Sequence, residues 1–125
     1  MGSPNDYRSL RVWQKAIDLG VMCYDLSREF PREEQFGLTS QLRRAAVSIA
    51  ANIAEGNGRL TIGEYLNQLS ISRGSVREVD THLEFALRLH YATHVEIGSV
   101  REVLDHEAAL LNRLIGSLKQ TGNRR

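Results

Sequence analysis

The stretch that most constrains the fold is residues 36–59, FGLTSQLRRAAVSIAANIAEGNGR. Its apolar residues recur every three or four positions, which is the spacing of one face of an α-helix. Several of them are alanine, so a second helix can approach this face closely. The pattern predicts a helix over about residues 38–55, and we expect Gly56 or Gly58 to end it in the left-handed conformation. The apolar face consists of Leu38, Leu42, Ala45, Ala46, Ile49 and Ile53.

Three other segments show the same helical spacing, and no segment alternates as a strand does. The chain has only 2 prolines, and Pro31 lies between the first two helical segments, where it ends the first one. Four amphipathic helices joined by short connections predict an all-α fold, an antiparallel up-down-up-down four-helix bundle. The predicted helices cover about residues 8–29, 38–55, 61–90 and 93–121.

The starts of the last two helices carry a local signal. Thr61 with Glu64, and Thr93 with Glu96, have the spacing of a capping box, in which a hydroxyl and a carboxylate bind the first free amides of a helix. The third helix has a weak centre around Gly74, because glycine inside a helix costs about 1 kcal/mol relative to alanine. We expect either a bend there or close packing against another helix.

The first helix carries two apolar lines instead of one. One neighbouring helix cannot cover both lines, so we expect either a central position for this helix or a contact between copies of the chain. The sequence therefore predicts a homo-oligomer. The two lines are Leu10, Trp13, Ile17, Gly20 and Tyr24, and Val12, Leu19, Met22 and Leu26.

The length of 125 residues fits a single domain. We expect residues 1–7 to be a disordered tail that includes a cloning scar, residues 8–121 to form the bundle, and residues 122–125 to be a basic C-terminal tail. No stretch approaches the roughly 18 apolar residues that cross a bilayer, and the polar start MGSPNDYRSL does not resemble a signal peptide. We therefore expect a cytoplasmic protein without a membrane partner.

The sequence contains no pattern typical of a catalytic or metal site. Di-iron bundles use Glu and His three residues apart on two helices, whereas Glu102 and His106 are four apart and have no second copy. The only cysteine, Cys23, lies among apolar residues and is expected in the core. The glycines near Gly56 follow a predicted helix, whereas a phosphate-binding loop precedes one. We expect no catalytic residue, no metal and no cofactor, and thus no enzymatic activity.

A polar line on the helix at residues 38–55 is the best candidate for a site. It consists of Arg44, Ser48, Asn52 and Glu55, and Arg59 continues it. In the favoured interpretation, Asn52 bonds across helices and sets their register, while Glu55 pairs with an arginine. In the other interpretation, the line contacts a ligand or RNA.

The basic residues suggest a second kind of site. The formal net charge is only +1, but 14 of the 16 basic residues are Arg, whose planar fork suits phosphate groups. In a ring of identical chains, each patch would be repeated. The candidates for RNA or DNA contact are Arg43, Arg44, Arg59 and Arg73, with Lys15 and Arg11 as secondary candidates. The alternative is an ordinary solvated surface, with the chain acting as a structural or protein-partner scaffold.

Several motifs resemble the family of 23S rRNA intervening-sequence proteins, and together they cover about residues 6–120. The central motif is QLRRAAVSI at 41–49 followed by NIAEG at 52–56 and Arg59. One difference is Ala50, where the family often has proline. The supporting motifs are VWQKA at 12–16, FP at 30–31, EQFGL at 34–38 and SRGS at 72–75.

The resemblance implies properties that the spacing of residues does not. It implies an antiparallel four-helix bundle that assembles into a ring-like homo-oligomer, typically a pentamer. It also implies a possible role in binding RNA or DNA, a possible protein partner, and no enzymatic activity.

Overall fold

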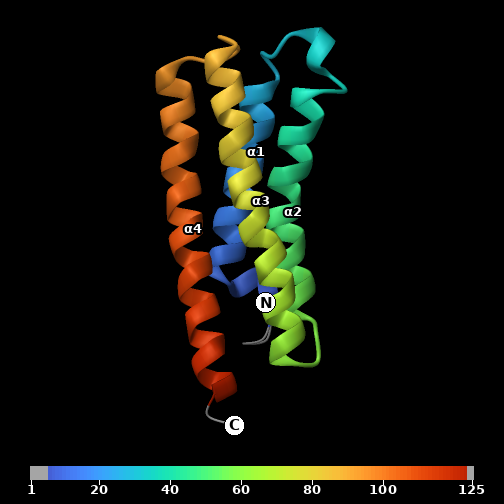
Figure 1. The fold of residues 1–125 in the computed structure, drawn as a ribbon, viewed down its shortest axis with the longest axis vertical. Helices are drawn as coiled ribbons and strands as arrows, with labels where there is room; N and C mark the ends of the chain where they lie inside the picture. The colour runs from blue at the N-terminus through green and yellow to red at the C-terminus, as the bar shows by residue number, and fades with distance from the viewer. Residues whose placement is uncertain (1–5, 124–125) are drawn as a thin grey trace.

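Four long helices follow one another along the chain (Figure 1): α1 (Arg11–Ser27), α2 (Leu38–Asn57), α3 (Ile62–Arg88) and α4 (His94–Asn123). The computed structural model describes residues 6–123, without the side chain of Asn123. Helices that are consecutive in the chain pack on one another, and α1 also packs on α4. The four contacts close a bundle in which successive helices run in opposite directions. The predicted all-α, antiparallel four-helix bundle is confirmed.

The two ends of the chain are only partly described. Residues 1–5 and 124–125, which we assigned to tails, lie outside the described residues. Of the other tail residues, Tyr7 belongs to a short 3-10 helix, η1 (Tyr7–Ser9), and Gly122 belongs to α4. Helix α1 begins at Arg11 instead of near Arg8, because Leu10 is extended with φ −76° and ψ 125°.

The core lies where the four apolar faces meet. Every helix contributes fully buried aliphatic side chains, for example Leu19 from α1, Ile49 from α2, Leu83 from α3 and Leu111 from α4. Burying one such side chain contributes about 1.5–3 kcal/mol. The connection between α1 and α2 contains a second 3-10 helix, η2 (Arg32–Glu34). Among the described residues, no helix is both long and apolar enough to cross a membrane.

The helix ends match the local signals at two places and differ at one. Thr93 and Glu96 form a reciprocal capping box, with amide-to-side-chain distances of 2.9 and 3.1 Å. The Thr61 hydroxyl accepts from the Glu64 amide at 3.1 Å. The predicted left-handed glycine after α2 is wrong, because Gly56 lies inside the helix and Gly58 has φ −85°.

The left-handed cap belongs to α3 instead. His90 has φ +63°, and it follows the last turn of α3. The Tyr91 amide donates to the Ala86 carbonyl at 2.8 Å, and the His90 amide donates to the Leu87 carbonyl at 3.1 Å. These two bonds form a Schellman motif, which satisfies the last carbonyls of the helix.

Helices α2 and α3 approach each other closely. A Cβ atom added at Gly56 would lie 2.9 Å from both Gln68 Cβ and Tyr65 Cδ1. The Ser72 hydroxyl donates to the Ile49 carbonyl of α2 at 2.9 Å. Helix α3 runs without a break through its centre, and Ser72 packs closely on α2 there. Gly74 takes no part in this packing, since no atom would lie within 4 Å of an added Cβ.

Candidate functional site

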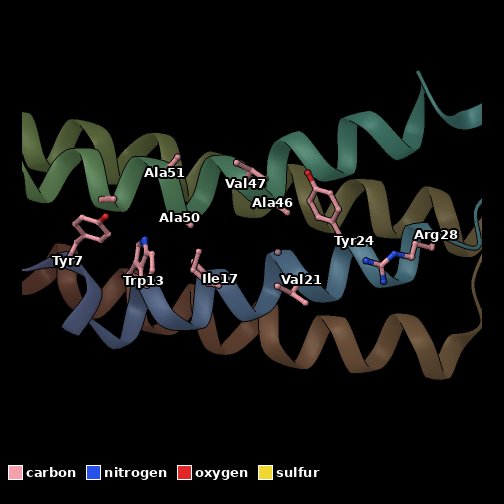
Figure 2. A pocket seen from close by; sticks show the side chains of 13 residues that line it. Tyr7, Trp13, Ile17, Val21, Tyr24, Arg28, Ala46, Val47, Ala50 and Ala51 are labelled. Carbon is pink, nitrogen blue, oxygen red and sulfur yellow. The ribbon is translucent and has the colours of Figure 1, made fainter. Parts of the chain in front are cut away.

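A groove of about 520 Å³ runs along the surface between α1 and α2. Figure 2 shows side chains of the two helices facing one another across it, with Tyr7 at one end and Arg28 at the other. Its lining is almost entirely apolar. From α1 come Trp13, Ala16, Ile17, Gly20, Val21 and Tyr24, and from α2 come Ala46, Val47, Ala50, Ala51 and Ala54.

The groove leaves large apolar side chains in contact with solvent. Ile17 is 40% exposed, Val21 56% and Val47 50%. Gly20 keeps the groove open, because nothing lies within 4 Å of the position of an added Cβ. Of the two apolar lines in the first helix, one is therefore buried in the bundle and the other lines this groove. Contiguous apolar surface of this kind is typical of a protein–protein contact.

A second groove continues from the first across the outer surface of α2. It shares Tyr24, Val47 and Ala51 with the first groove. Phe36, which is 89% exposed, lies at its edge in the connection before α2. The second groove is mixed in character, because polar side chains such as Arg44 and Asn52 line it together with Phe36 and Val47.

The polar line on α2 separates into a half-buried middle, Ser48 and Asn52, and exposed ends. The Asn52 side chain donates to both the carbonyl and the hydroxyl of Ser48, each at 2.9 Å. From α3, Gln68 donates to Asn52 Oδ1 and Ser75 donates to Ser48 Oγ, both at 2.9 Å. Asn52 and Ser48 therefore join α2 to α3, as the structural interpretation of the line requires.

The ends of the line lie outside this network. Arg59 pairs with Glu55 one turn earlier on the surface, in an ion pair that is worth little in water. Arg44 is exposed and, among the described residues, makes no ion pair. It lines a polar groove between α2 and α3 together with Glu78 and His82. Partial burial lowers the pKa of His82, while the nearby Glu78 acts in the opposite direction.

Arg43 is held differently from its neighbour Arg44. Its Nε donates to Ser27 Oγ at 2.8 Å, and its guanidinium lies 4.6 Å from the centre of the Tyr24 ring. Both partners belong to α1, so Arg43 ties the end of α1 to α2. This contact occupies one face of the guanidinium that we considered for nucleic-acid binding.

The remaining basic candidates lie on other sides of the bundle. Arg73 lines a groove between α3 and α4, where Asp80 and Asp105 also lie. Arg11 is exposed at the start of α1, and Lys15 is half-buried one turn later. The six candidates thus do not form one surface within a single chain.

The thiol considered for catalysis, Cys23, is buried in the core. Burial raises the pKa of the Cys23 thiol to about 12, so the thiol is not ionised near neutral pH. Within the described part of the chain, no group of three or more His, Cys, Asp or Glu side chains could hold a metal ion.

Comparison with known families decides the membership of the chain. A family model described as "23S rRNA-intervening sequence protein" matches residues 8–113. The chain belongs to the 23S rRNA-intervening sequence protein family. A solved structure shares the fold of this family member with a TM-score of 0.75 and 24% sequence identity, covering 83% of this chain and 97% of the other. That structure is of a protein of unknown function from the S23 ribosomal protein family of Bacteroides thetaiotaomicron. No curated protein matches the sequence.

Residues that the sequence pattern did not single out complete the site of this family member. Gln68, Ser72 and Ser75 of α3 are the partners of the α2 polar line. The available signal was that these polar residues recur on the apolar side of α3. Buried hydroxyls and amides need hydrogen-bond partners, so this recurrence could have predicted polar contacts with a neighbouring helix. Val21 and Val47, in the wall of the apolar groove, were likewise not assigned to a surface.

Proposed function

We propose that this family member is a non-catalytic scaffold that assembles from several copies of itself, as a pentamer by family resemblance. The observation that carries the proposal is the apolar groove between α1 and α2. Its alanine floor and the open position at Gly20 leave room for a helix, and its exposed valines and isoleucine would be buried by one. A second copy supplies such a helix, since α3 exposes Ile71 and Phe85, and Leu89 is exposed directly after its end.

The test of assembly is the mass of the particle in solution. We expect native mass spectrometry and light scattering to give a multiple of the 14.1 kDa chain mass. Val47→Glu should reduce the particle to single chains, because it places a charge in an apolar contact without disturbing the core. Leu60→Glu is the matched control, as Leu60 is 97% exposed in the connection between α2 and α3 and does not line the groove.

The proposal includes contact with RNA or DNA through arginines that the assembly repeats around itself. Arg44 and Arg73 support it best, because they are exposed and, within the described residues, make no ion pair. If they neutralise phosphates, the affinity for structured RNA falls steeply as salt rises. Reversing both Arg43 and Arg44 to Glu is a poor test on its own, since Arg43 also joins α1 to α2.

A cleaner test compares Arg44→Glu and Arg73→Glu with Arg113→Glu, an exposed arginine of α4 outside the candidate set. We expect the first two to weaken RNA binding and to reduce its salt dependence, because each removes a phosphate contact. Fluorescence anisotropy over a salt series measures both. Binding that is unaffected by either change would remove these arginines from the proposal.

A protein partner is the second candidate function, and the mixed charge of two grooves favours it. Glu78 lies beside Arg44, and Asp80 and Asp105 lie beside Arg73. Acidic groups at these places repel phosphates but suit a protein surface of both signs. Capture of the same partner from cell lysate with and without nuclease treatment would support this alternative. Loss of all captured material after nuclease would instead support nucleic-acid binding.

A further inference from the structure

Glu107 is the most unusual side chain in the core. It lies in α4, its side chain is fully buried, and neither of its carboxyl oxygens has a hydrogen-bond partner among the residues that the structure describes. An ionised carboxylate without a partner is costly to bury, so such a group takes up a proton instead. Consistent with this, burial raises the pKa of Glu107 from 4.5 to about 8, against the opposing field of Lys15.

The surroundings of Glu107 come from α1 and α3, the two helices packed on α4. From α1, Lys15 is the charged group that acts on it, while Asp18 is exposed and the buried Cys23 thiol is neutral. From α3, the charged groups beside α4 line a separate groove or pair with Arg101, and they exert no resolved effect on Glu107. These α3 groups are Arg73, Arg77, Asp80 and Glu84.

The contact between α1 and α4 is also the one that lacks polar ties. Side-chain hydrogen bonds join α1 to α2 through Arg43, α2 to α3 through Gln68, and α3 to α4 through Arg101. Among the described residues, no side-chain hydrogen bond joins α1 to α4. Within the part of the chain that the structure describes, this contact therefore has no polar tie, and Lys15 of α1 is the charged group whose field reaches the buried acid.

We propose that Glu107 is a proton-operated latch between α1 and α4, and that Lys15 shifts the pH at which it opens. With its proton, the neutral Glu107 side chain stays in the core and α4 stays packed on α1. Loss of the proton favours local separation of the two helices, because the carboxylate then gains the water that it lacks in the core. Lys15 opposes this separation, because its ammonium attracts the carboxylate within the closed bundle. The latch does not depend on the proposed function.

The direction of the effect follows from proton linkage. Glu107 holds its proton more tightly in the closed bundle than in an opened or unfolded chain. The proton on Glu107 therefore contributes its full stabilisation of the closed bundle below the usual pKa of a glutamate. This contribution is lost as pH rises through the folded pKa of about 8. Opening between α1 and α4 should thus increase from mildly acidic to mildly alkaline pH and then level off.

The experiment is amide hydrogen exchange, with rates corrected for the intrinsic effect of pH. From about pH 5.5 to about pH 8, we expect protection around Glu107 in α4 and around Lys15 in α1 to fall by on the order of tenfold or more. Protection in the α2–α3 contact should change much less. The variant Glu107→Gln keeps the shape without a titrating group, and its protection should not depend on pH. The variant Glu102→Gln removes an exposed carboxylate of the same helix, so it should behave like the unsubstituted protein.

A second measurement does not depend on any variant of Glu107. Carbon-13 NMR of the Glu107 carboxyl should give a titration midpoint well above that of exposed glutamates, and Lys15→Met should raise it further. A normal midpoint, or a midpoint that Lys15→Met leaves unchanged, would refute the latch. Equal loss of protection in all four helices would also refute it, because the whole bundle would then respond instead of one contact.

Discussion

The Nε atom of Arg43 in α2 donates a hydrogen bond of 2.8 Å to Ser27 Oγ in the last turn of α1. The Ser27 hydroxyl in turn donates to the Cys23 carbonyl at 2.7 Å, so Arg43 is linked through Ser27 to the backbone of α1 near its end. A positive charge near the C-terminal end of a helix is also favourable for the helix dipole. An arginine that we considered for nucleic-acid binding thus has a definite place in the fold.

Replacing this arginine should destabilise the protein. We expect Arg43→Met to lower the free energy of unfolding by about 1–3 kcal/mol, because it removes a charge-assisted bond and leaves Ser27 with one partner fewer. Urea denaturation measures the loss. The matched change Arg44→Met should have little effect, since Arg44 is exposed in the adjacent position. Equal losses in the two variants would contradict a structural role for Arg43.

Gly56 should tolerate no side chain. An added Cβ would lie 2.9 Å from two atoms of α3 and 3.3 Å from the Tyr65 carbonyl, so α2 and α3 would have to separate. We expect Gly56→Ala to cost about 1–3 kcal/mol through overpacking, although alanine is the better helix former.

Gly98 is the matched control for this change, because it lies in α4 with nothing within 4 Å of an added Cβ. There the helix propensity acts alone, so Gly98→Ala should stabilise the protein by up to about 1 kcal/mol. Thermal unfolding compares the two variants directly. A stabilising Gly56→Ala would show that the two helices are not as close as described.

The bond between Asn52 and Gln68 should appear as a coupling between the two residues. We expect the double-mutant cycle of Asn52→Ala and Gln68→Ala to give an interaction energy of about 1 kcal/mol, since the two side chains are hydrogen-bonded neighbours. Denaturant unfolding of the four proteins measures it. A cycle of Glu55→Ala with Gln68→Ala should give a value near zero, because Glu55 pairs with Arg59 instead.

The Cys23 thiol should react only when the bundle opens. Burial raises its pKa to about 12, which is about three or more pH units above the range from pH 7 to pH 9. Nearly all of the thiol therefore stays protonated in that range. We expect the rate of modification by a thiol reagent to follow the unfolding rate and to rise sharply in denaturant. A fast reaction in the native protein at neutral pH would show that the thiol is accessible.

Local patterns predicted the helices because helix formation is a local event. The spacing of apolar residues in α2 and the capping pairs at Thr61 and Thr93 depend on side chains three or four residues apart. The exception is the end of α2, where two glycines suggested a left-handed cap and Gly56 serves close packing instead. Nothing within α2 distinguishes these two uses, because the packing atoms belong to Tyr65 and Gln68.

The sequence by itself determined the four helices, their order, and the apolar faces that require a bundle. The tertiary structure decided which polar groups meet. It brought Ser48 to Ser75, 27 residues apart in the chain, and it left Glu107 in the core with no hydrogen-bond partner among the described residues. It also decided that one apolar line of α1 is buried and the other lines a groove. The physical reason is that helix periodicity shows which residues share a face, but only the packing of the helices decides what that face meets.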